Sequence, residues 1–346
     1  MDIQAAITDL VAARDLDATD MQSAMRQIMG GEASPAQIGA FLVALRIKGE
    51  TIAEIAAATA VMRELATPVM VSADNLVDIV GTGGDGANLF NVSTASSFVV
   101  AAAGGHVAKH GNRSVSSTSG SSDVLQQLGV KLELNPEQVA RCIEQVGMGF
   151  MFAPAHHSAM KHAAGPRKDL GLRTIFNMLG PMTNPAGVKR QLIGVYDAAL
   201  CRPMAEVLKQ LGSEHIMVVH SDEGLDEISI AGGTQVVELR DGTISEYRVK
   251  PEDFKLQPAS LEDLKVGSAE QSVALIRGAL SGAEDAASQA AARMIMLNAG
   301  AAIYISGVAA TLADGVQMAD DAIASGAAKL KITELVQFTE LAVAAG

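Results

Sequence analysis

The feature that most limits how this sequence can fold is a change in hydrophobic periodicity at Asn75. Before it, apolar residues recur at helical spacing, and after it short apolar stretches alternate with helical segments. Strands that are joined through helices pair in parallel and are covered by helices on both faces. The sequence therefore predicts an α/β fold with a mainly parallel central sheet flanked by helices, and a hairpin around Asp241-Gly242. The strands are predicted at 76–80, 106–109, 130–134, 191–196 and 215–220.

The first 72 residues predict a separate, small all-helical domain. Ser34-Pro35 begins one helix, and Thr51 with Glu54 forms a capping box that begins another. The segment of about 163–186 interrupts the later alternation with three cations and a helical stretch at 172–179, and we expect it to return to the helical domain. The predicted domains are a small helical domain at 1–72, joined by that segment, and a large α/β domain at 73–162 and 187–346.

The strongest local signal is the glycine loop after the first strand. Four of the six residues in Gly81-Thr-Gly-Gly-Asp-Gly86 are glycine. Glycines adopt positive φ and let backbone N–H groups approach an anion. The loop is neither a Walker loop nor a GxGxxG fingerprint, and its Asp85 indicates contact with a hydroxyl or a phosphate-bound metal. The alternative is a tight strand-to-helix turn without a ligand.

Two further segments have the composition of an anion site. Asn91-Val-Ser-Thr94 precedes a helix, where it either caps the helix or leaves its N-terminus to a phosphate. The segment from Lys109 to Ser122 combines cations with many hydroxyls in a glycine-broken loop after a strand. Residues of this kind at the carboxyl edge of a sheet suit an anionic ligand, and the alternative is a flexible linker.

Two acidic residues, Asp226 and Glu227, follow the predicted strand that ends at His220. Adjacent carboxylates in this position either hold Mg²⁺ that is shared with phosphates or form a solvated acidic loop. His156, His157 and His162 lack the spacing of a zinc site and are expected on helix surfaces. The sequence supports no Ser-His-Asp or Cys-His arrangement.

The composition indicates which partners and which cellular compartment to expect. The chain has 39 acidic and 26 basic residues, a net charge of −13, and only 3% aromatic residues, so nucleic acid is not an expected partner. No apolar run reaches the roughly 18 residues of a membrane helix, so no membrane association is expected, and the acidic N-terminal segment is not expected to be a signal peptide. Two cysteines without a CxxC pair predict a reducing, cytoplasmic location.

Four segments of the chain, taken together, closely resemble the anthranilate phosphoribosyltransferase family, in register over nearly the whole sequence. They are GTGGDGANLFNVST, AKHGNRSVSSTSGSSDVL, GPRKDLGLRTIFNMLGPMTNPAG and GLDEIS. The resemblance implies transfer of the phosphoribosyl group of phosphoribosyl pyrophosphate to the amine of anthranilate, the second step of tryptophan biosynthesis from chorismate. It also implies a nucleoside-phosphorylase-like pair of domains, Mg²⁺ as cofactor and a homodimer.

The resemblance also implies which residues form the site. No side chain is implied as a catalytic acid or base, and Lys109 would act electrostatically. The implied anthranilate contacts are Gly81, Asn112 and Arg167, with Arg167 on the carboxylate, and the implied magnesium ligands are Ser93, Asp226 and Glu227. The implied contacts of phosphoribosyl pyrophosphate are Gly81, Gly84, Asp85, Asn91, Ser93, Thr94, Lys109, Asn112, Arg113, Ser117 and Ser121.

Two positions depart from the family pattern. Leu89 stands where the family usually has a phosphate-binding Thr, which removes one hydroxyl contact. Ala164-Gly165-Pro166 replaces the usual Val-containing stretch ahead of Arg167, which affects how that side chain is aimed.

Two other functions remain open at this point. A pyrimidine-nucleoside phosphorylase of the same fold would use inorganic phosphate, but Asn112 and the Asp226-Glu227 pair favour the transferase. A non-catalytic paralogue that binds nucleic acid would lose the glycine loop and gain basic surface, whereas this chain keeps the loop and is acidic.

Overall fold

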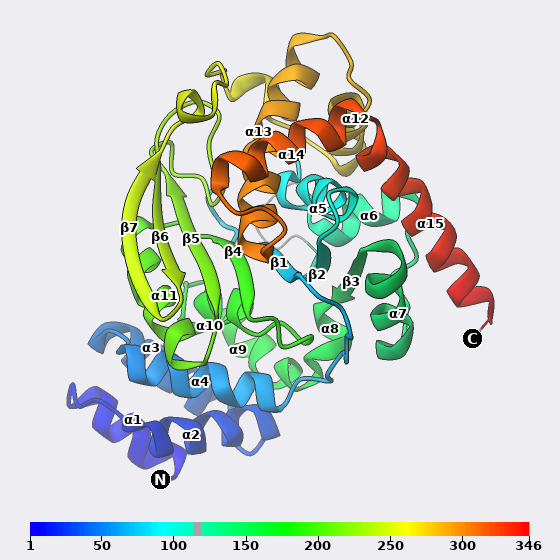
Figure 1. Cartoon of the computed structure of the whole chain (residues 1–346). Helices are drawn as coiled ribbons and strands as arrows, with labels where there is room; N and C mark the ends of the chain where they lie inside the picture. The colour runs from blue at the N-terminus through cyan, green and yellow to red at the C-terminus, as the bar shows by residue number, and fades with distance from the viewer. Residues whose placement is uncertain (114–118, 346) are drawn as a thin grey trace.

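The computed structural model of the protein describes residues 1–113 and 119–345. Its central sheet has the strand order β3-β2-β1-β4-β5-β6-β7 (Figure 1). Strands β1 to β5 pair in parallel, and β6 and β7 add an antiparallel hairpin at one edge. The predicted α/β fold and hairpin are confirmed. The strands are β1 (Leu76–Gly81), β2 (His106–Gly111), β3 (Met148–Phe152), β4 (Arg190–Gly194), β5 (His215–Ser221), β6 (Thr234–Arg240) and β7 (Thr243–Val249).

Because side chains alternate along each strand, each face of the sheet has a large hydrophobic core, and a smaller third core includes Ala108 of β2 and Met151 of β3. On one face Ile79 and Met217 join a core that is built with α5 and α13, and the C-terminal helix α15 packs on α5 along that flank (Figure 1). On the other face Ile193 and Val218 join a core that is built with α11 and the N-terminal helices. The helices of the α/β part are α5 (Val92–Ala102), α6 (Ser121–Leu128), α7 (Pro136–Val146), α11 (Cys201–Gln210), α12 (Ala269–Leu280), α13 (Ala286–Ser306), α14 (Leu312–Ala324) and α15 (Ala327–Ala345).

The N-terminal residues form helices only, as predicted. The capping boxes at Ser34 and Thr51 are both present, and Gly31 ends the second helix in the left-handed conformation. Glu54, the capping-box partner of Thr51, is fully buried and accepts hydrogen bonds from the Leu16 N–H and the Lys48 ammonium. The helices are α1 (Ile3–Val11), α2 (Ala18–Gly30), α3 (Pro35–Lys48) and α4 (Ile52–Glu64).

Residues 153–182 form a run of short helices that packs against the N-terminal helices. Helix α9 contacts α2 and α3, and α10 contacts α3 and α4. The Arg63 Nε of α4 donates to the Met182 carbonyl at 2.7 Å. This run, called the returning segment below, is α8 (Ala153–His156), η1 (Ser158–Met160), α9 (Lys161–Leu170), α10 (Ile175–Leu179) and η2 (Gly180–Met182), and the remaining short helices are η3 (Ala198–Leu200), η4 (Pro251–Phe254) and η5 (Glu262–Leu264).

One predicted strand was wrong and one strand was missed. Residues 130–134 pair with no strand in the part of the chain that the structure describes. Val130 and Leu132 are buried beside the C-terminal helix, and the Lys131 N–H donates to the Thr339 hydroxyl of α15 at 3.1 Å. The apolar pattern there reflects burial, not strand pairing. The missed strand is β3, and the predicted helix at 172–179 begins only at Ile175.

Both cysteines are free and fully buried, Cys142 in the core on the α5 face and Cys201 in the core on the other face. Burial raises the pKa of each thiol to about 12. None of the helices in the described ranges is long and apolar enough to cross a membrane.

Candidate active site

The predicted site residues gather at the carboxyl edge of the sheet, beside β1 and β4. Strand β1 leads to β2 on one side and is flanked by β4 on the other, so the strand order reverses here. Open parallel sheets bind ligands at such reversal points. Gly81 at the end of β1 lies opposite Gly194 at the end of β4. A Cβ on either glycine would collide with Asp226, at 2.3 Å from its carboxylate for Gly81 and 1.5 Å from its carbonyl for Gly194. These two glycines therefore make the space in which Asp226 reaches the end of β1.

The glycine loop is held in place by hydrogen bonds to both neighbouring strands. The Thr82 N–H donates to the Gly194 carbonyl at 2.9 Å, and the Gly83 N–H donates to the Asp226 carboxylate at 2.7 Å. Gly83, Gly84 and Gly86 have φ of +65°, +78° and +75°, a region that strains any other residue. The run of glycines is thus explained by backbone conformation.

The residue ahead of α5 does not cap the helix with its side chain. Asn91, the residue ahead of the helix, makes no capping hydrogen bond. Its side-chain oxygen accepts from the hydroxyls of Ser119 and Ser272, at 3.0 and 2.9 Å. The alternative in which Asn91 only caps the helix is therefore wrong, and the positive end of the helix dipole remains available to an anion. Thr94, one turn inside, is fully buried and its hydroxyl has no hydrogen-bond partner in the described structure.

Lys109 is the buried cation of this edge. Its side chain lies on the α5 face of β2, only 1% exposed, where the ammonium donates to the Ile79 carbonyl at 2.7 Å and the Ser93 hydroxyl at 3.2 Å. Burial lowers the pKa of Lys109, while the negative charges of Asp78 and Glu227 oppose that shift. The ammonium is thus directed at the N-terminus of α5.

Asp226 and Glu227 lie in the loop after β5 and are half-buried. Burial, together with the nearby carboxylate of Asp85, raises the pKa of Asp226 to about 7. Burial and the charge of Asp226 raise the pKa of Glu227 well above its ordinary value. Lys109 and the Ser93 N–H act in the opposite direction and lower this pKa. The site thus concentrates carboxylates that a cation would stabilise, so a solvated surface loop does not describe them.

This donor set fits magnesium. In the described residues, no three His, Cys, Asp or Glu side chains converge into an all-protein metal cage. Mg²⁺ is usually held by one or two carboxylates together with substrate phosphates and waters, and not by such a cage. The carboxylates of Asp226 and Glu227, with the Ser93 hydroxyl beside them, are oxygen donors of the required kind.

The remaining predicted contacts lie around this centre. Asn112 and Arg113 are exposed just after β2, and the side-chain oxygen Oδ1 of Asn112 accepts from the Arg113 N–H at 2.8 Å. Ser121 is the first residue of α6 and lies against Gly111. Ser117 lies outside the described residues. Leu89, at the position of the family's Thr, packs against the core and pairs with Lys265, so the loop accommodates an apolar side chain there.

Arg167 lies in the returning segment, in the last turn of α9. Its guanidinium carbon is 5.1 Å from the centre of the Phe176 ring, and burial lowers its pKa. The Arg167 side chain makes no hydrogen bond or ion pair with the residues that the structure describes, although its backbone carbonyl accepts from the Gly171 N–H. Its donors are therefore free for a planar carboxylate.

A buried ion pair that was not predicted from the sequence lies beneath the site. Asp78 of β1 and His110 of β2 lie on the face opposite Lys109, with 2.6 Å between the Asp78 carboxylate and the His110 Nδ1. His110 Nε2 donates to the Gly180 carbonyl at 2.9 Å, which links the sheet to the returning segment. Burial opposes both charges, yet the pair raises the pKa of His110 and lowers that of Asp78. An aspartate inside an apolar strand was the available signal.

The expectation that His156 and His157 lie on a helix surface is wrong. Both are buried where the returning segment meets the sheet, and burial lowers the pKa of His156 and takes that of His157 to about 4. The His156 ring is held by the backbone, since its Nδ1 lies 3.1 Å from the Thr67 carbonyl.

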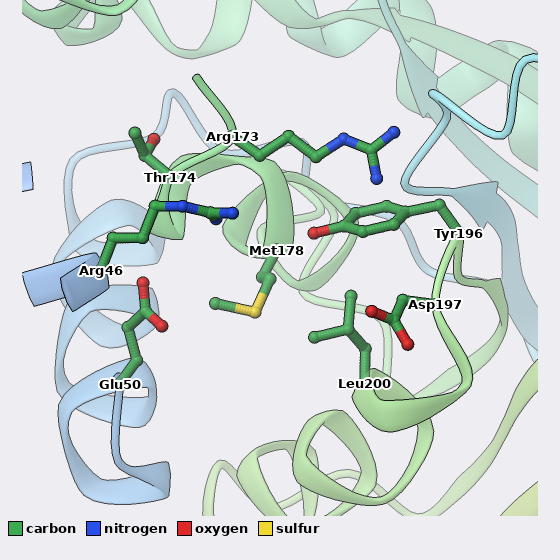
Figure 2. Close-up of a pocket in the computed structure, with 8 residues that line it drawn as sticks. All are labelled: Arg46, Glu50, Arg173, Thr174, Met178, Tyr196, Asp197 and Leu200. Atoms are coloured by element: carbon green, nitrogen blue, oxygen red, sulfur yellow. The ribbon is translucent and has the colours of Figure 1, made fainter. Parts of the chain in front are cut away.

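A second missed residue is Arg173, which lines a pocket of about 330 Å³ between the helical domain and the sheet edge (Figure 2). Its Nη2 donates to the Gly84 carbonyl at 2.5 Å, so it reaches the glycine loop from the returning segment. The pocket is lined by Arg46, Glu50, Arg173, Thr174, Met178, Tyr196, Asp197 and Leu200.

Comparison with known proteins identifies relatives over the whole chain. The sequence matches the glycosyl transferase family, helical bundle domain, at residues 4–66 and the glycosyl transferase family, a/b domain, at residues 73–329. It is 64% identical over 341 residues to the anthranilate phosphoribosyltransferase of Saccharophagus degradans, covering 99% of this chain and 100% of that protein. The enzyme of the same name from Cellvibrio japonicus is also 64% identical, over 98% of this chain and 99% of the relative.

Solved structures agree with these relatives. The anthranilate phosphoribosyltransferase of Thermus thermophilus superposes with a TM-score of 0.91 at 43% identity, over 97% of this chain and 99% of that one. The Saccharomyces cerevisiae enzyme, solved in complex with phosphoribosyl pyrophosphate and Mg, gives a TM-score of 0.88 at 26% identity over 98% of each chain. These relatives favour the transferase over the phosphorylase and the nucleic-acid-binding protein.

Proposed function

The chain belongs to the anthranilate phosphoribosyltransferase family, and from this premise we propose that it transfers the phosphoribosyl group of phosphoribosyl pyrophosphate to the amine of anthranilate. The products are N-(5-phosphoribosyl)anthranilate and pyrophosphate, and the reaction is the second step of tryptophan biosynthesis from chorismate. The observation that carries the proposal is the meeting of Lys109, the N-terminus of α5 and the Asp226-Glu227 pair at one sheet edge. This combination suits a polyphosphate that binds with a divalent cation.

The anionic donor substrate is assigned to the large domain. The glycine loop with Gly81, Gly84 and Asp85, and the N-terminus of α5 with Asn91, Ser93 and Thr94, offer backbone N–H groups and hydroxyls. The family resemblance implies four further contacts of this substrate, Asn112, Arg113, Ser117 and Ser121. Breaking the ribose C1–pyrophosphate bond produces a highly charged leaving group, which Lys109 stabilises electrostatically from its fixed position.

The acceptor is assigned to the space between Gly81, Asn112 and Arg167. Arg167 binds the carboxylate of anthranilate, because a guanidinium pairs with a carboxylate through two parallel hydrogen bonds. The amine of anthranilate is an aniline and is neutral at pH 7, so it needs orientation more than a strong base. A dedicated acid or base among the side chains is therefore not required.

Magnesium is proposed as the cofactor, held by Ser93, Asp226 and Glu227. When bound, it neutralises charge on the pyrophosphate as the bond breaks. Replacing both Asp226 and Glu227 with Ala should leave the fold intact but raise the Mg²⁺ concentration needed for activity, or abolish turnover. Activity would be measured over a Mg²⁺ titration, with circular dichroism as the folding control. Wild-type activity at ordinary Mg²⁺ would contradict the assignment.

The direct test of the function is the loss of anthranilate fluorescence on addition of phosphoribosyl pyrophosphate, with and without Mg²⁺. We expect fluorescence to fall only when both are present. Phosphate-dependent cleavage of thymidine would instead identify a phosphorylase, and salt-sensitive DNA binding at micromolar protein would identify the nucleic-acid-binding alternative.

We further propose that the protein is a cytoplasmic homodimer. The buried, unpaired cysteines are consistent with a reducing compartment. Val11 of α1 and Ile47 of α3, two helices that pack on each other, are 73% and 81% exposed and offer an apolar contact for a second copy. Light scattering after gel filtration would give the mass, and Ile47→Glu should shift it toward the monomer.

A further inference from the structure

We propose that Arg173 is a positioning residue for the donor substrate: it fixes the direction of the Gly84–Asp85 peptide group from the returning segment, with Tyr196 orienting its guanidinium. The proposal rests on the proposed function, because it concerns the loop that would bind phosphoribosyl pyrophosphate. Arg173 is not one of the substrate contacts that the family resemblance implies.

Two contacts fix the Arg173 side chain. Its Nη2 donates to the Gly84 carbonyl at 2.5 Å, and its guanidinium carbon is 3.7 Å from the centre of the Tyr196 ring. Figure 2 shows the guanidinium extending alongside this ring. A cation held over an aromatic face is attracted to it, and the flat guanidinium can stack there while its edge donates. With the face of the guanidinium stacked on Tyr196, the N–H groups at its edge are directed at the glycine loop.

Tyr196 is itself tied to the glycine loop. Its backbone N–H donates to the Thr82 hydroxyl at 3.1 Å, while the Thr82 N–H donates to the Gly194 carbonyl at 2.9 Å. The first half of the loop is thus fixed by β4 and the residues after it. The second half, at Gly84, is held by Arg173.

The hydrogen bond at Gly84 determines where the next N–H points. The Gly84 carbonyl and the Asp85 N–H belong to one planar trans peptide group, so they point in opposite directions. With the carbonyl held by Arg173, the Asp85 N–H points away from the returning segment. Donation to the carbonyl also polarises the peptide and strengthens this N–H as a donor.

The backbone freedom of Gly84 is the reason that the peptide group after it needs to be held. Gly84 has φ of +78°, and glycine moves between backbone regions at little steric cost. A Cβ at this position would lie 3.3 Å from Arg173 Nη2, so the arginine packs directly on the loop. Without Arg173, rotation of the Gly84–Asp85 peptide would replace an N–H that faces the anion with a carbonyl oxygen that repels it.

The position of Arg173 in the chain couples the two substrates. It lies six residues after Arg167, the proposed ligand of the anthranilate carboxylate, in the same returning segment. One segment would therefore hold the acceptor directly and the donor loop through Arg173.

The test compares Arg173→Ala, Arg173→Lys, Tyr196→Leu and Tyr196→Phe, with Arg46→Ala as the matched control. Arg46 is an exposed arginine of the same pocket, with no hydrogen bond or ion pair among the described residues. Steady-state kinetics would give both KM values, and calorimetry would measure binding of phosphoribosyl pyrophosphate with Mg²⁺ without turnover. Thermal melts would report folding.

Arg173→Ala should raise the KM and Kd for phosphoribosyl pyrophosphate by about tenfold to a hundredfold, the effect of losing one hydrogen bond to a charged group. The anthranilate KM should change little. Added guanidinium should partly restore Arg173→Ala, and Arg173→Lys should be intermediate. Tyr196→Leu should weaken donor binding, and Tyr196→Phe, which keeps the ring, should weaken it less than Tyr196→Leu does. Arg46→Ala should behave as wild type.

The outcomes separate this inference from the proposed function. A wild-type chain without turnover would contradict the function, and calorimetry would still decide whether Arg173 governs donor binding. Unchanged donor affinity in Arg173→Ala, or equal effects on both substrates without rescue by guanidinium, would overturn the positioning role. If Arg173→Ala does not fold, unchanged donor affinity in Tyr196→Leu and Arg173→Lys would overturn it instead.

Discussion

Lys109 and His110 are neighbours in β2, yet they serve opposite faces of the sheet. Lys109 faces the N-terminus of α5 and donates to Ser93, whereas His110 faces the returning segment and donates to Gly180. Strand geometry alone dictates this division, because successive side chains point to opposite faces. Lys109 thus faces the proposed phosphate site, and His110 links the sheet to the segment that carries Arg167.

The role of Arg167 can be tested by a charge-conserving change. Arg167→Lys keeps the cation but loses the two parallel donors of the guanidinium. It should therefore raise the anthranilate KM far more than the KM for phosphoribosyl pyrophosphate, as measured by steady-state fluorescence. An equal effect on both substrates, or none, would place Arg167 outside the acceptor site.

The pair of Asp78 and His110 predicts how stability depends on pH. The folded state raises the pKa of His110 above the unfolded value of about 6.5, so the folded protein binds its proton more tightly. The stabilisation is complete below about pH 6.5 and is lost as the pH rises through the folded pKa, by at most about 1.4 kcal/mol per pH unit. His156 and His157, with lowered pKa values, titrate below this window.

Urea unfolding between pH 6 and pH 9 would measure this dependence. Asp78→Asn removes the charge that raises the pKa of His110, so the His110 part of the decline should disappear in that variant, whereas the part that follows Asp226, whose pKa is raised to about 7, should remain. A decline of the same slope in both proteins would assign it to other groups.

Among the elements, the ends of β1 and β4 are tightly constrained, because Gly81 and Gly194 both lie against Asp226. Gly194→Ala would place a Cβ 1.5 Å from the Asp226 carbonyl, so the loop that carries the proposed magnesium ligands must shift. We expect a loss of about 1–3 kcal/mol in the free energy of unfolding, typical of overpacking, and a weaker response to Mg²⁺.

Gly39→Ala is the matched control, because a Cβ at that position in α3 meets nothing within 4 Å. It should stabilise the protein by about 0.5–1 kcal/mol, the usual gain for Ala over Gly inside a helix. Denaturant unfolding of both variants would check the pair. Equal stability of Gly194→Ala and wild type would show that the close approach is relieved at no cost.

Elements with local signals were predictable, and those that depend on distant contacts were not. The capping boxes at Ser34 and Thr51 involve residues three apart and were read correctly. Residues 130–134 have the same apolar character as a strand, but the Lys131 N–H donates to Thr339, more than two hundred residues away. The glycine loop was visible as a cluster, whereas the contact of Arg173 with Gly84 joins two motifs whose proximity only the fold creates.

At the scale of the whole molecule, the chain passes between the helical and α/β parts three times, and the connection after the N-terminal helices lies beside both of the others. The Val69 N–H donates to the Pro185 carbonyl at 3.0 Å, and the Thr67 N–H donates to the His156 carbonyl at 2.8 Å. Adjacent connections of this kind can serve as one hinge, and closure would shield a reactive sugar from water. We propose that residues 67–75 and 186–190 act as this hinge.

We expect phosphoribosyl pyrophosphate with Mg²⁺ to shift the chain toward a more closed form. Small-angle scattering should then show a smaller radius of gyration, and proteolysis at 67–75 and 186–190 should change. Phosphoribosyl pyrophosphate without Mg²⁺ is the control. An unchanged radius of gyration together with unchanged proteolysis would count against a hinge.

The two cysteines make the wild-type chain suitable for measuring local unfolding of its two large cores by thiol labelling. Cys142 and Cys201 lie one in each main core, and burial raises the pKa of each thiol to about 12. Since the thiolate is the reactive form, an alkylating reagent should modify either residue only when the surrounding core becomes exposed. Equal labelling rates would mean that the two cores open as one cooperative unit, and unequal rates would show which face of the sheet opens first.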